Sequence, residues 1–339
     1  MRLYRSRLFA LSKSESFKPR YTAQGWSAFP RQLSFTGDFE DGPAFAERMH
    51  HQAAIIATDK LSNQRIRFTY APEIMLEARS RLSAQRAAFL IAASKTVFDG
   101  DFTSGEPFTV VSDDGDLEDL NPLEYDAALR TSIGAFGYAI ATELAAKISR
   151  RRNWMNALAK YWLSLRTCSI PSIEHHPRYG DRFKVEKDAF NHAIMAQAVV
   201  SAYSSIEELN LEIRASQQVP SKIEGKWNPA VLDNLQSRLS AVGIQYDQTT
   251  LWIRRTTPTR IERTYVPPDG VRPAWARFSV RDRLVPLIDA IHYASLLRSR
   301  VSSHRMHKLT HSLTIYDVIN VQNLARRLIL EAMGFWGRT

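Results

Sequence analysis

Two residues that suit phosphodiester chemistry lie close together in the stretch LLRSRVSSHRMHK, Leu296 to Lys308. Arg298 and His304 are separated by five residues. Histidine titrates near neutral pH, so it can accept or donate a proton. Arginine stays charged and can stabilise the negative charge that develops on a phosphate. Cleavage of RNA through its 2′-hydroxyl needs these two functions and no metal ion, so we interpret Arg298 and His304 as candidate catalytic residues.

Two other interpretations of the same stretch stay open. Arg300 and His307, with six residues between them, form a second pair of the same kind. We favour Arg298 with His304, because the apolar run ASLL before Arg298 marks the end of a helix. The other interpretation assigns no catalytic role: the basic residues at the end of the helix only complement the negative end of its dipole.

The histidines of this stretch also have the spacing of metal ligands. His304, His307 and His311 follow one another at intervals of three and four, which on a helix would place them on one face for zinc. The sequence around them is typical of a loop, and no cysteine or carboxylate lies nearby. We therefore predict no metal and no cofactor.

No phosphate-binding glycine loop, dinucleotide motif or serine-hydrolase elbow is present, which argues against nucleotide hydrolysis and acyl transfer.

Positive charge is concentrated around these residues. The chain has a net charge of +10, and residues 254–308 contain twelve Lys/Arg against four Asp/Glu. Such an excess favours binding to a polyanion, although a merely basic surface is the alternative. The candidate RNA-binding residues are Arg254, Arg255, Arg300, Arg305, His307 and Lys308.

The elements that must position these residues form two predicted parts, 1–175 and 176–339. The first part is predicted to be mostly helical with minor β content, and to act as a specificity or regulatory module. Strand-like residues occupy 26–39 and 64–74. Helical patterns occupy 43–61, 72–97 and 123–166.

The second part is predicted to be a helical bundle. Four helical patterns cover 184–216, 228–243, 281–301 and 314–335, with a β-hairpin over 249–266 inserted between the second and third. Asn228 is a predicted N-cap with Pro229 at the first helical position, and Gly243 ends that helix. Thr314 and Asp317 have the spacing of a capping box.

This order of elements, with arginine and histidine at the end of the third bundle helix, resembles the HEPN superfamily. The resemblance covers about residues 184–336 and includes YSSIEELNLEIRAS in the first helix and YDVINVQNLARRLILEA in the last. It implies a four-helix bundle and a metal-independent endoribonuclease with catalytic Arg298 and His304. A carboxylate of the first helix would support the arginine, and Glu207 is preferred over Glu208 because it borders the apolar face. Ser299 departs from the family, whose active members usually have Asn, Asp or His after the arginine.

The resemblance also implies partners and a setting. HEPN nucleases are similar in using two-fold dimers that bring two motifs together, so we expect a homodimer that cleaves tRNA or mRNA in anti-phage defence or toxin-like growth arrest. The alternative is a non-catalytic HEPN-like subunit that binds RNA or dimerises within a larger assembly. No apolar run approaches the roughly 20 residues of a membrane span, and the single Cys168 excludes an internal disulfide, so we predict a cytoplasmic protein.

Overall fold

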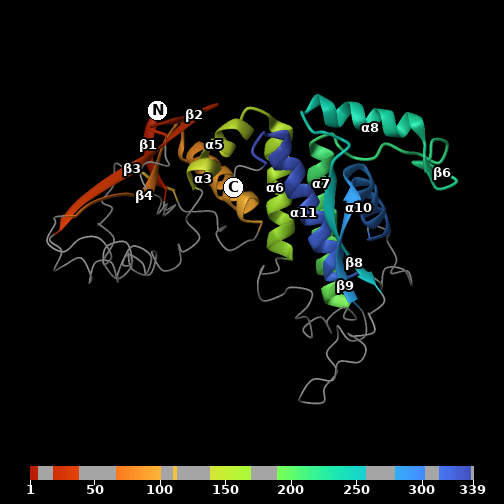
Figure 1. The fold of residues 1–339 in the computed structure, drawn as a ribbon. Coiled ribbons are helices and arrows are strands. Elements are labelled where there is room, and N and C mark those ends of the chain that lie inside the picture. Colours follow the sequence, from red (N-terminus) through yellow and green to blue (C-terminus); the bar gives the residue numbers. More distant parts are fainter. Residues whose placement is uncertain are drawn as a thin grey trace, which may run out of the picture. The chain divides into compact units, whose positions relative to one another are not determined.

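The computed structural model describes residues 1–6, 18–37, 66–100, 110–112, 138–168, 189–256, 279–301 and 313–336. These residues are mainly helical, with small antiparallel sheets (Figure 1). They form two compact units, one of 1–96 with 103–150 and one of 97–102 with 151–339. The helices of these described segments include none that is long and apolar enough to cross a membrane.

The first unit contains a five-stranded antiparallel sheet in the order β2-β3-β4-β1-β5. Its strands are β1 (Arg2–Ser6), β2 (Tyr21–Ala23), β3 (Trp26–Gly37), β4 (Ile66–Ala78) and β5 (Val110–Ser112). β4 pairs with β3 on one side and β1 on the other, and its residues Ile74 to Leu76 are all buried. A continuous apolar run suits a strand with no exposed face. Gly25 has a φ of +85° in the two-residue turn between β2 and β3, a conformation that favours glycine.

Two helices complete the described part of this unit, α3 (Arg81–Asp99) and α5 (Tyr138–Ile148). The Ser80 hydroxyl accepts a hydrogen bond from the Ser83 backbone N–H at 3.2 Å, which satisfies one of the free donors at the start of α3. α3 presents small buried residues on one side, including Ala84 and Ala88. α5 lies against β2.

The sequence predictions for this unit need correction. The strands predicted at 26–39 and 64–74 are confirmed as β3 and β4. The helix predicted from Pro72 is wrong over its first residues, because 72–78 continue β4 and the helix begins only at Arg81. Pairing with β3 and β1 outweighs the helical pattern there. Among the described residues of this unit, the β content exceeds the minor share predicted. The helix predicted over 43–61 lies outside the described residues.

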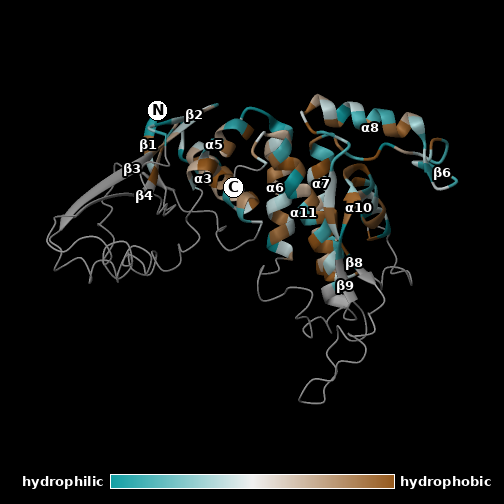
Figure 2. Ribbon diagram, viewed as in Figure 1, coloured by the Kyte–Doolittle hydropathy of each residue, from teal (hydrophilic) through white to brown (hydrophobic). Residues whose placement is uncertain are grey.

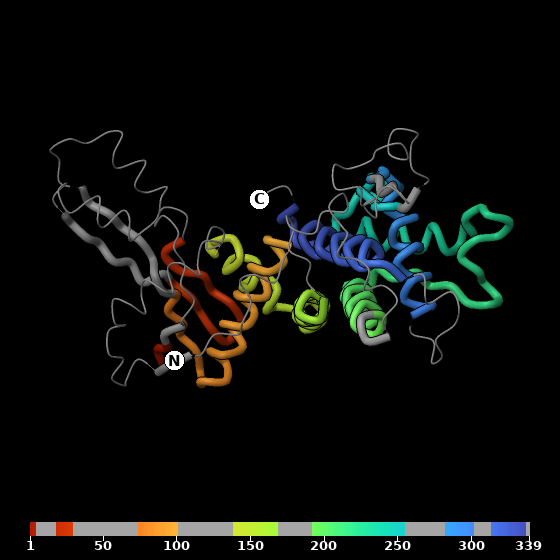
Figure 3. Tube along the Cα trace, turned by 90° about the horizontal axis from the view of Figure 1, so that it is seen from below, coloured from red at the N-terminus to blue at the C-terminus, as the bar shows by residue number. Residues whose placement is uncertain are grey.

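The second unit is built on four helices that pack against one another: α6 (Arg152–Thr167), α7 (Ala189–Glu208), α10 (Leu287–Val301) and α11 (Ile315–Ala332). In Figure 3, α6 and α7 are seen nearly end-on and α11 crosses them. Hydrophobic residues recur along all four (Figure 2). Their fully buried side chains include Leu158, Ile206, Ile291 and Leu328, so the core of the unit lies between these helices.

α6 belongs to this bundle, which the sequence did not predict. The Ser164 hydroxyl of α6 donates to the Ala198 carbonyl of α7 at 2.7 Å, and the Gln322 amide of α11 donates to the Ser164 hydroxyl at 3.1 Å. Small side chains allow this close approach of the two backbones. The predicted helix over 123–166 is interrupted at Ser149–Arg151, and the compact units divide at 150/151, whereas the sequence placed the boundary near 175.

α8 (Pro229–Ala241) lies across the end of the bundle, next to a small hairpin of β6 (Lys222–Ile223) and β7 (Lys226–Trp227) (Figure 1). Its predicted start is confirmed, because the Asn228 side chain accepts from the Ala230 N–H at 3.1 Å and Pro229 is the first helical residue. The place expected for α8 among the four packed helices is taken by α6.

The inserted hairpin also differs from the prediction. β8 (Thr249–Thr256) pairs with β9 (Ser279–Pro286), whereas the sequence predicted a hairpin within 249–266; the predicted second strand of that hairpin lies outside the described residues. β9 was predicted as the first turn of a helix, but α10 begins at Leu287, directly after Pro286. Proline lacks the N–H that a helix interior needs, so it suits this junction between strand and helix. The Asn320 side chain of α11 bonds both backbone groups of Ile253, at 2.8 and 2.9 Å, and holds β8 against the bundle.

Candidate functional site

An arginine and a carboxylate predicted to act together lie side by side at the ends of two bundle helices. Arg298 in the last turn of α10 places Nη2 3.4 Å from Oε1 of Glu207 in the last turn of α7. The Ser204 hydroxyl donates to the other oxygen, Glu207 Oε2, at 3.0 Å. Arg298 and Glu207 are 40% and 32% exposed, so solvent or a ligand reaches both. We call these two residues the arginine–carboxylate pair.

The contact of Arg298 with Glu207 uses one of the guanidinium nitrogens, Nη2. A guanidinium has five N–H donors, and the carboxylate contact occupies one edge. Arg298 Nε is buried and has no hydrogen-bond partner among the described residues. Glu207 therefore orients the guanidinium, and a phosphate can approach only the exposed part of the Arg298 side chain, not the buried Nε.

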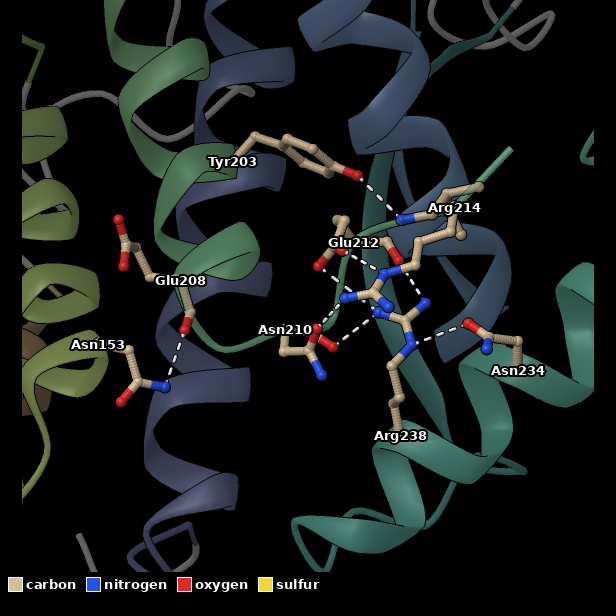
Figure 4. Close-up of polar contacts among 9 residues, drawn as sticks. Asn153, Tyr203, Glu208, Asn210, Glu212, Arg214, Asn234 and Arg238 are labelled. Carbon is tan, nitrogen blue, oxygen red and sulfur yellow. Dashed lines mark hydrogen bonds and ion pairs between the residues drawn. The ribbon is translucent and has the colours of Figure 1, made fainter. Parts of the chain in front are cut away.

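Tyr203 fixes the helices behind the pair. Its side chain is 2% exposed, and its hydroxyl hydrogen-bonds to Ser295 of α10 and accepts from the Ile213 N–H at 3.3 Å (Figure 4). Burial raises the pKa of Tyr203 above its ordinary value, so the ring stays a neutral hydrogen-bonding group. Tyr203 lies one turn before Glu207 and ties α7, α10 and the chain after α7 together at the level of the pair.

Glu208 has a different environment from its neighbour. Its carboxylate forms an ion pair with Lys160 Nζ of α6 at 2.7 Å, and its backbone carbonyl accepts from the Asn153 amide at 3.1 Å (Figure 4). The hydrogen bond from Lys160 holds the pKa of Glu208 below its usual value. Consecutive helical residues point in different directions, so Glu208 faces α6 while Glu207 faces α10.

A group of polar residues orders the chain that follows α7, and the sequence did not predict it. Arg238 of α8 donates to the carbonyls of Asn210 and Glu212, at 2.7 and 2.8 Å (Figure 4). The Glu212 carboxylate lies 2.7 Å from Arg214 Nε and 3.5 Å from Arg238 Nη1. The donors of Arg238 are thus used within the protein, and its role is to anchor the end of α7 that carries Glu207. Each residue alone resembles an ordinary surface residue, so only a long-range contact could have identified them.

Other predicted site residues are placed only in part. His304, Arg305, His307 and Lys308 lie outside the described residues, and so does the histidine group weighed as a zinc site. Arg300 is an exposed residue of the last turn of α10. Among the residues that the structure describes, no three His, Cys, Asp or Glu side chains are grouped as metal ligands.

Arg254 lies on β8 and stacks over an aromatic ring. Its guanidinium carbon is 5.0 Å from the ring centre of Tyr293, which in turn lies 5.8 Å from Trp252. A stacked guanidinium keeps its in-plane donors available, so Arg254 can still contact a phosphate. Arg255 is the next residue of the strand, and its side chain lies outside the described residues.

The single cysteine is not a nucleophile at neutral pH. Burial raises the pKa of Cys168 to about 11, so the thiol stays protonated.

A comparison with known proteins found no matching family model, no matching curated protein and no matching solved structure.

Proposed function

We propose that the chain is a metal-independent endoribonuclease of HEPN type, in which Arg298 and His304 are catalytic and Glu207 positions the arginine. The observation that supports this most directly is the 3.4 Å contact between Arg298 Nη2 and Glu207 Oε1. The two residues come from helices far apart in the sequence, and the resemblance assigned them to one site. A partly exposed, carboxylate-oriented arginine is suited to bind a phosphate that gains charge in a transition state.

In this proposal the reaction proceeds through the 2′-hydroxyl of the RNA. A histidine removes the proton of that hydroxyl, the oxygen attacks the adjacent phosphorus, and a second proton donor protonates the leaving 5′-oxygen. Arg298 stabilises the charge on the phosphate in between. Each chain supplies one His304, so a two-fold dimer provides both proton-transfer groups. Arg254 and Arg300 contact the RNA backbone, and tRNA or mRNA is the substrate of a defence or growth-arrest protein.

A non-catalytic subunit that binds RNA or dimerises is the second candidate, and one contact favours it. The residue after Arg298 is Ser299, whose hydroxyl donates to the Ser295 carbonyl of its own helix at 2.9 Å. A hydroxyl used in this way gives less support to a reacting phosphate than the Asn, Asp or His of active family members.

The test is cleavage of total RNA and tRNA in EDTA by the purified protein. Loss of a general acid or base lowers the rate by about 10²–10⁴-fold, so His304→Ala abolishes measurable cleavage and Arg298→Ala weakens it severely. Glu207→Gln keeps the shape of the side chain but loses the charge that holds Arg298, so it reduces the rate less. His307→Ala distinguishes the two motif registers, because it weakens RNA binding but does not abolish cleavage as His304→Ala does.

Two outcomes contradict the nuclease. Equal cleavage by wild type and His304→Ala assigns the activity to another site or to a contaminant. RNA binding without cleavage by the wild-type dimer favours the non-catalytic subunit. Circular dichroism of each variant separates loss of activity from loss of fold.

A further inference from the structure

A second basic site lies in the first unit and shares no residue with the arginine–carboxylate pair. It is a pocket of about 310 Å³ between the chain leading into β2 and the end of α5. That volume is at the lower end of the roughly 300–1,000 Å³ typical of small-ligand sites. The residues that matter for its chemistry are Lys18, Arg20, Tyr21, Glu143, Lys147 and Arg150.

The pocket is strongly cationic. Four of its lining residues are basic and one, Glu143, is acidic. Arg20 also binds Glu77 of β4 through two hydrogen bonds, at 2.7 and 3.1 Å, and this carboxylate is not part of the lining. Among the described residues, these four basic and two acidic side chains give a net charge of +2.

The ion pairs in the pocket are ones that a ligand can open. Lys18 Nζ lies 3.0 Å from Glu143 Oε1, with the two side chains 58% and 37% exposed. Ion pairs this exposed contribute little to stability, so an anion can displace the carboxylate from the lysine. Arg150 is exposed and forms no ion pair within the described part of the chain.

Among the described residues that line the pocket, none offers an exposed ring on which a nucleobase could stack. Tyr21 is 5% exposed, and its hydroxyl accepts from the Lys18 backbone N–H at 3.0 Å. Its ring is therefore packed inside the unit rather than open for stacking. Lys147 in the last turn of α5 and Arg150, two residues after the end of that helix, line the same pocket as Lys18 and Arg20. Ammonium and guanidinium groups gathered in this way suit linked phosphates.

We propose that this pocket binds an oligophosphate, that is, a group of two or more linked phosphates. The phosphates replace Glu143 at Lys18 and pair with Arg150 and Lys147. Such a group occurs on nucleotides and at the 5′ end of a triphosphorylated RNA. The inference concerns the first unit alone and holds whether or not the second unit cleaves RNA.

The test is calorimetric titration of the full-length protein with inorganic pyrophosphate at low salt. The wild type binds pyrophosphate, and Lys147→Gln/Arg150→Gln weakens binding about tenfold or more, because each charge-assisted hydrogen bond contributes substantially to affinity. Glu143→Gln strengthens binding, since Lys18 no longer has a competing carboxylate. Arg86→Gln changes an exposed arginine of α3 outside the pocket and leaves binding unchanged.

Competition identifies the source of the phosphates. Displacement of pyrophosphate by ATP assigns a nucleotide, and displacement by a 5′-triphosphorylated oligonucleotide, but not by the same oligonucleotide with a 5′-hydroxyl, assigns an RNA end. Absence of pyrophosphate binding overturns the proposal. It is also overturned if Arg86→Gln weakens binding as much as the pocket variant does, because the attraction is then a property of total charge.

Discussion

His292 of α10 shows how one buried residue makes stability depend on pH. Its Nε2 lies 2.8 Å from the Ser221 hydroxyl, and its ring packs edge-on against Trp227 at 5.1 Å between ring centres. Nδ1 is buried and has no hydrogen-bond partner among the described residues. Burial lowers the pKa of His292, and the charge of Lys222 lowers it further, while Asp289 acts in the opposite direction. The ring is therefore neutral at pH 7.

This environment predicts a loss of stability in mild acid. In the unfolded chain His292 titrates near its ordinary pKa of about 6.5, above its pKa in the folded state. The unfolded state thus takes up the proton first, so the contribution of His292 is complete above about pH 6.5 and declines as the pH falls toward the folded-state pKa. Urea unfolding at pH 7.5 and 5.5 measures this decline.

The control for this prediction is His292→Gln, which keeps a polar group near Ser221 but cannot titrate. The free energy of unfolding of the variant falls less between the two pH values than that of the wild type. An identical fall in both proteins would show that His292 does not contribute.

At the scale of the element, helix ends determine where the site residues lie. α7 stops at Glu208 because Asn210 adopts a φ of +63° and reverses the chain. The Leu211 N–H donates to the Ile206 carbonyl at 3.1 Å and the Asn210 N–H to the Glu207 carbonyl at 2.9 Å, the Schellman arrangement. Leu211 and Ile206 are both fully buried, so this helix end is also packed. Glu207 thus reaches Arg298 from a rigid last turn.

Substitutions at Asn210 test this helix end. A β-branched residue is strained in the left-handed region, so Asn210→Val lowers the free energy of unfolding by about 1–2 kcal/mol. Glycine adopts that conformation without strain, so Asn210→Gly stays within about 0.5 kcal/mol of wild type. Denaturant unfolding of the three proteins measures both effects. Equal destabilisation by both substitutions would mean that the side-chain contact of Asn210 with Arg214 dominates instead.

At the scale of the whole molecule, the excess of positive charge governs the proposed association with RNA. The net charge of +10 includes an excess of eight in residues 254–308. Each phosphate neutralised by a basic side chain releases counterions, so the affinity for RNA falls as the salt concentration rises.

The contribution of a single arginine can be measured from that salt dependence. Arg254→Gln removes one predicted phosphate contact and lowers the slope of log affinity against log salt by up to about 1. Fluorescence anisotropy of a labelled tRNA over a series of KCl concentrations gives the slope. Arg79→Gln makes the same charge change at an exposed residue before α3 and leaves the slope unchanged. A similar reduction in both variants would indicate that Arg254 has no direct contact.

The sequence by itself predicted the features that depend on neighbours a few residues apart. The N-cap at Asn228 is confirmed, and so is the capping box in which Asp317 accepts from both the backbone N–H and the hydroxyl of Thr314, at 2.8 and 2.9 Å. β3 and β4 were also predicted, because their residues favour strands. The end of α7 was missed, since the sequence pattern continues past Asn210 and a left-handed asparagine has no strong local signal.

Only the tertiary structure decided which distant segments meet. The last residues of β4, 72–78, and β9 from residue 281 onward were predicted as helix, because a short segment fits either state until a partner strand pairs with it. Likewise, α6 belongs to the bundle because Ser164 contacts Ala198 and Gln322, which are far from it in the sequence. Glu207 and Glu208 are adjacent and chemically alike, and it is packing that directs one to Arg298 and the other to Lys160. Local patterns determine the elements and their ends, whereas burial of their apolar faces against one another determines which side chains form a site.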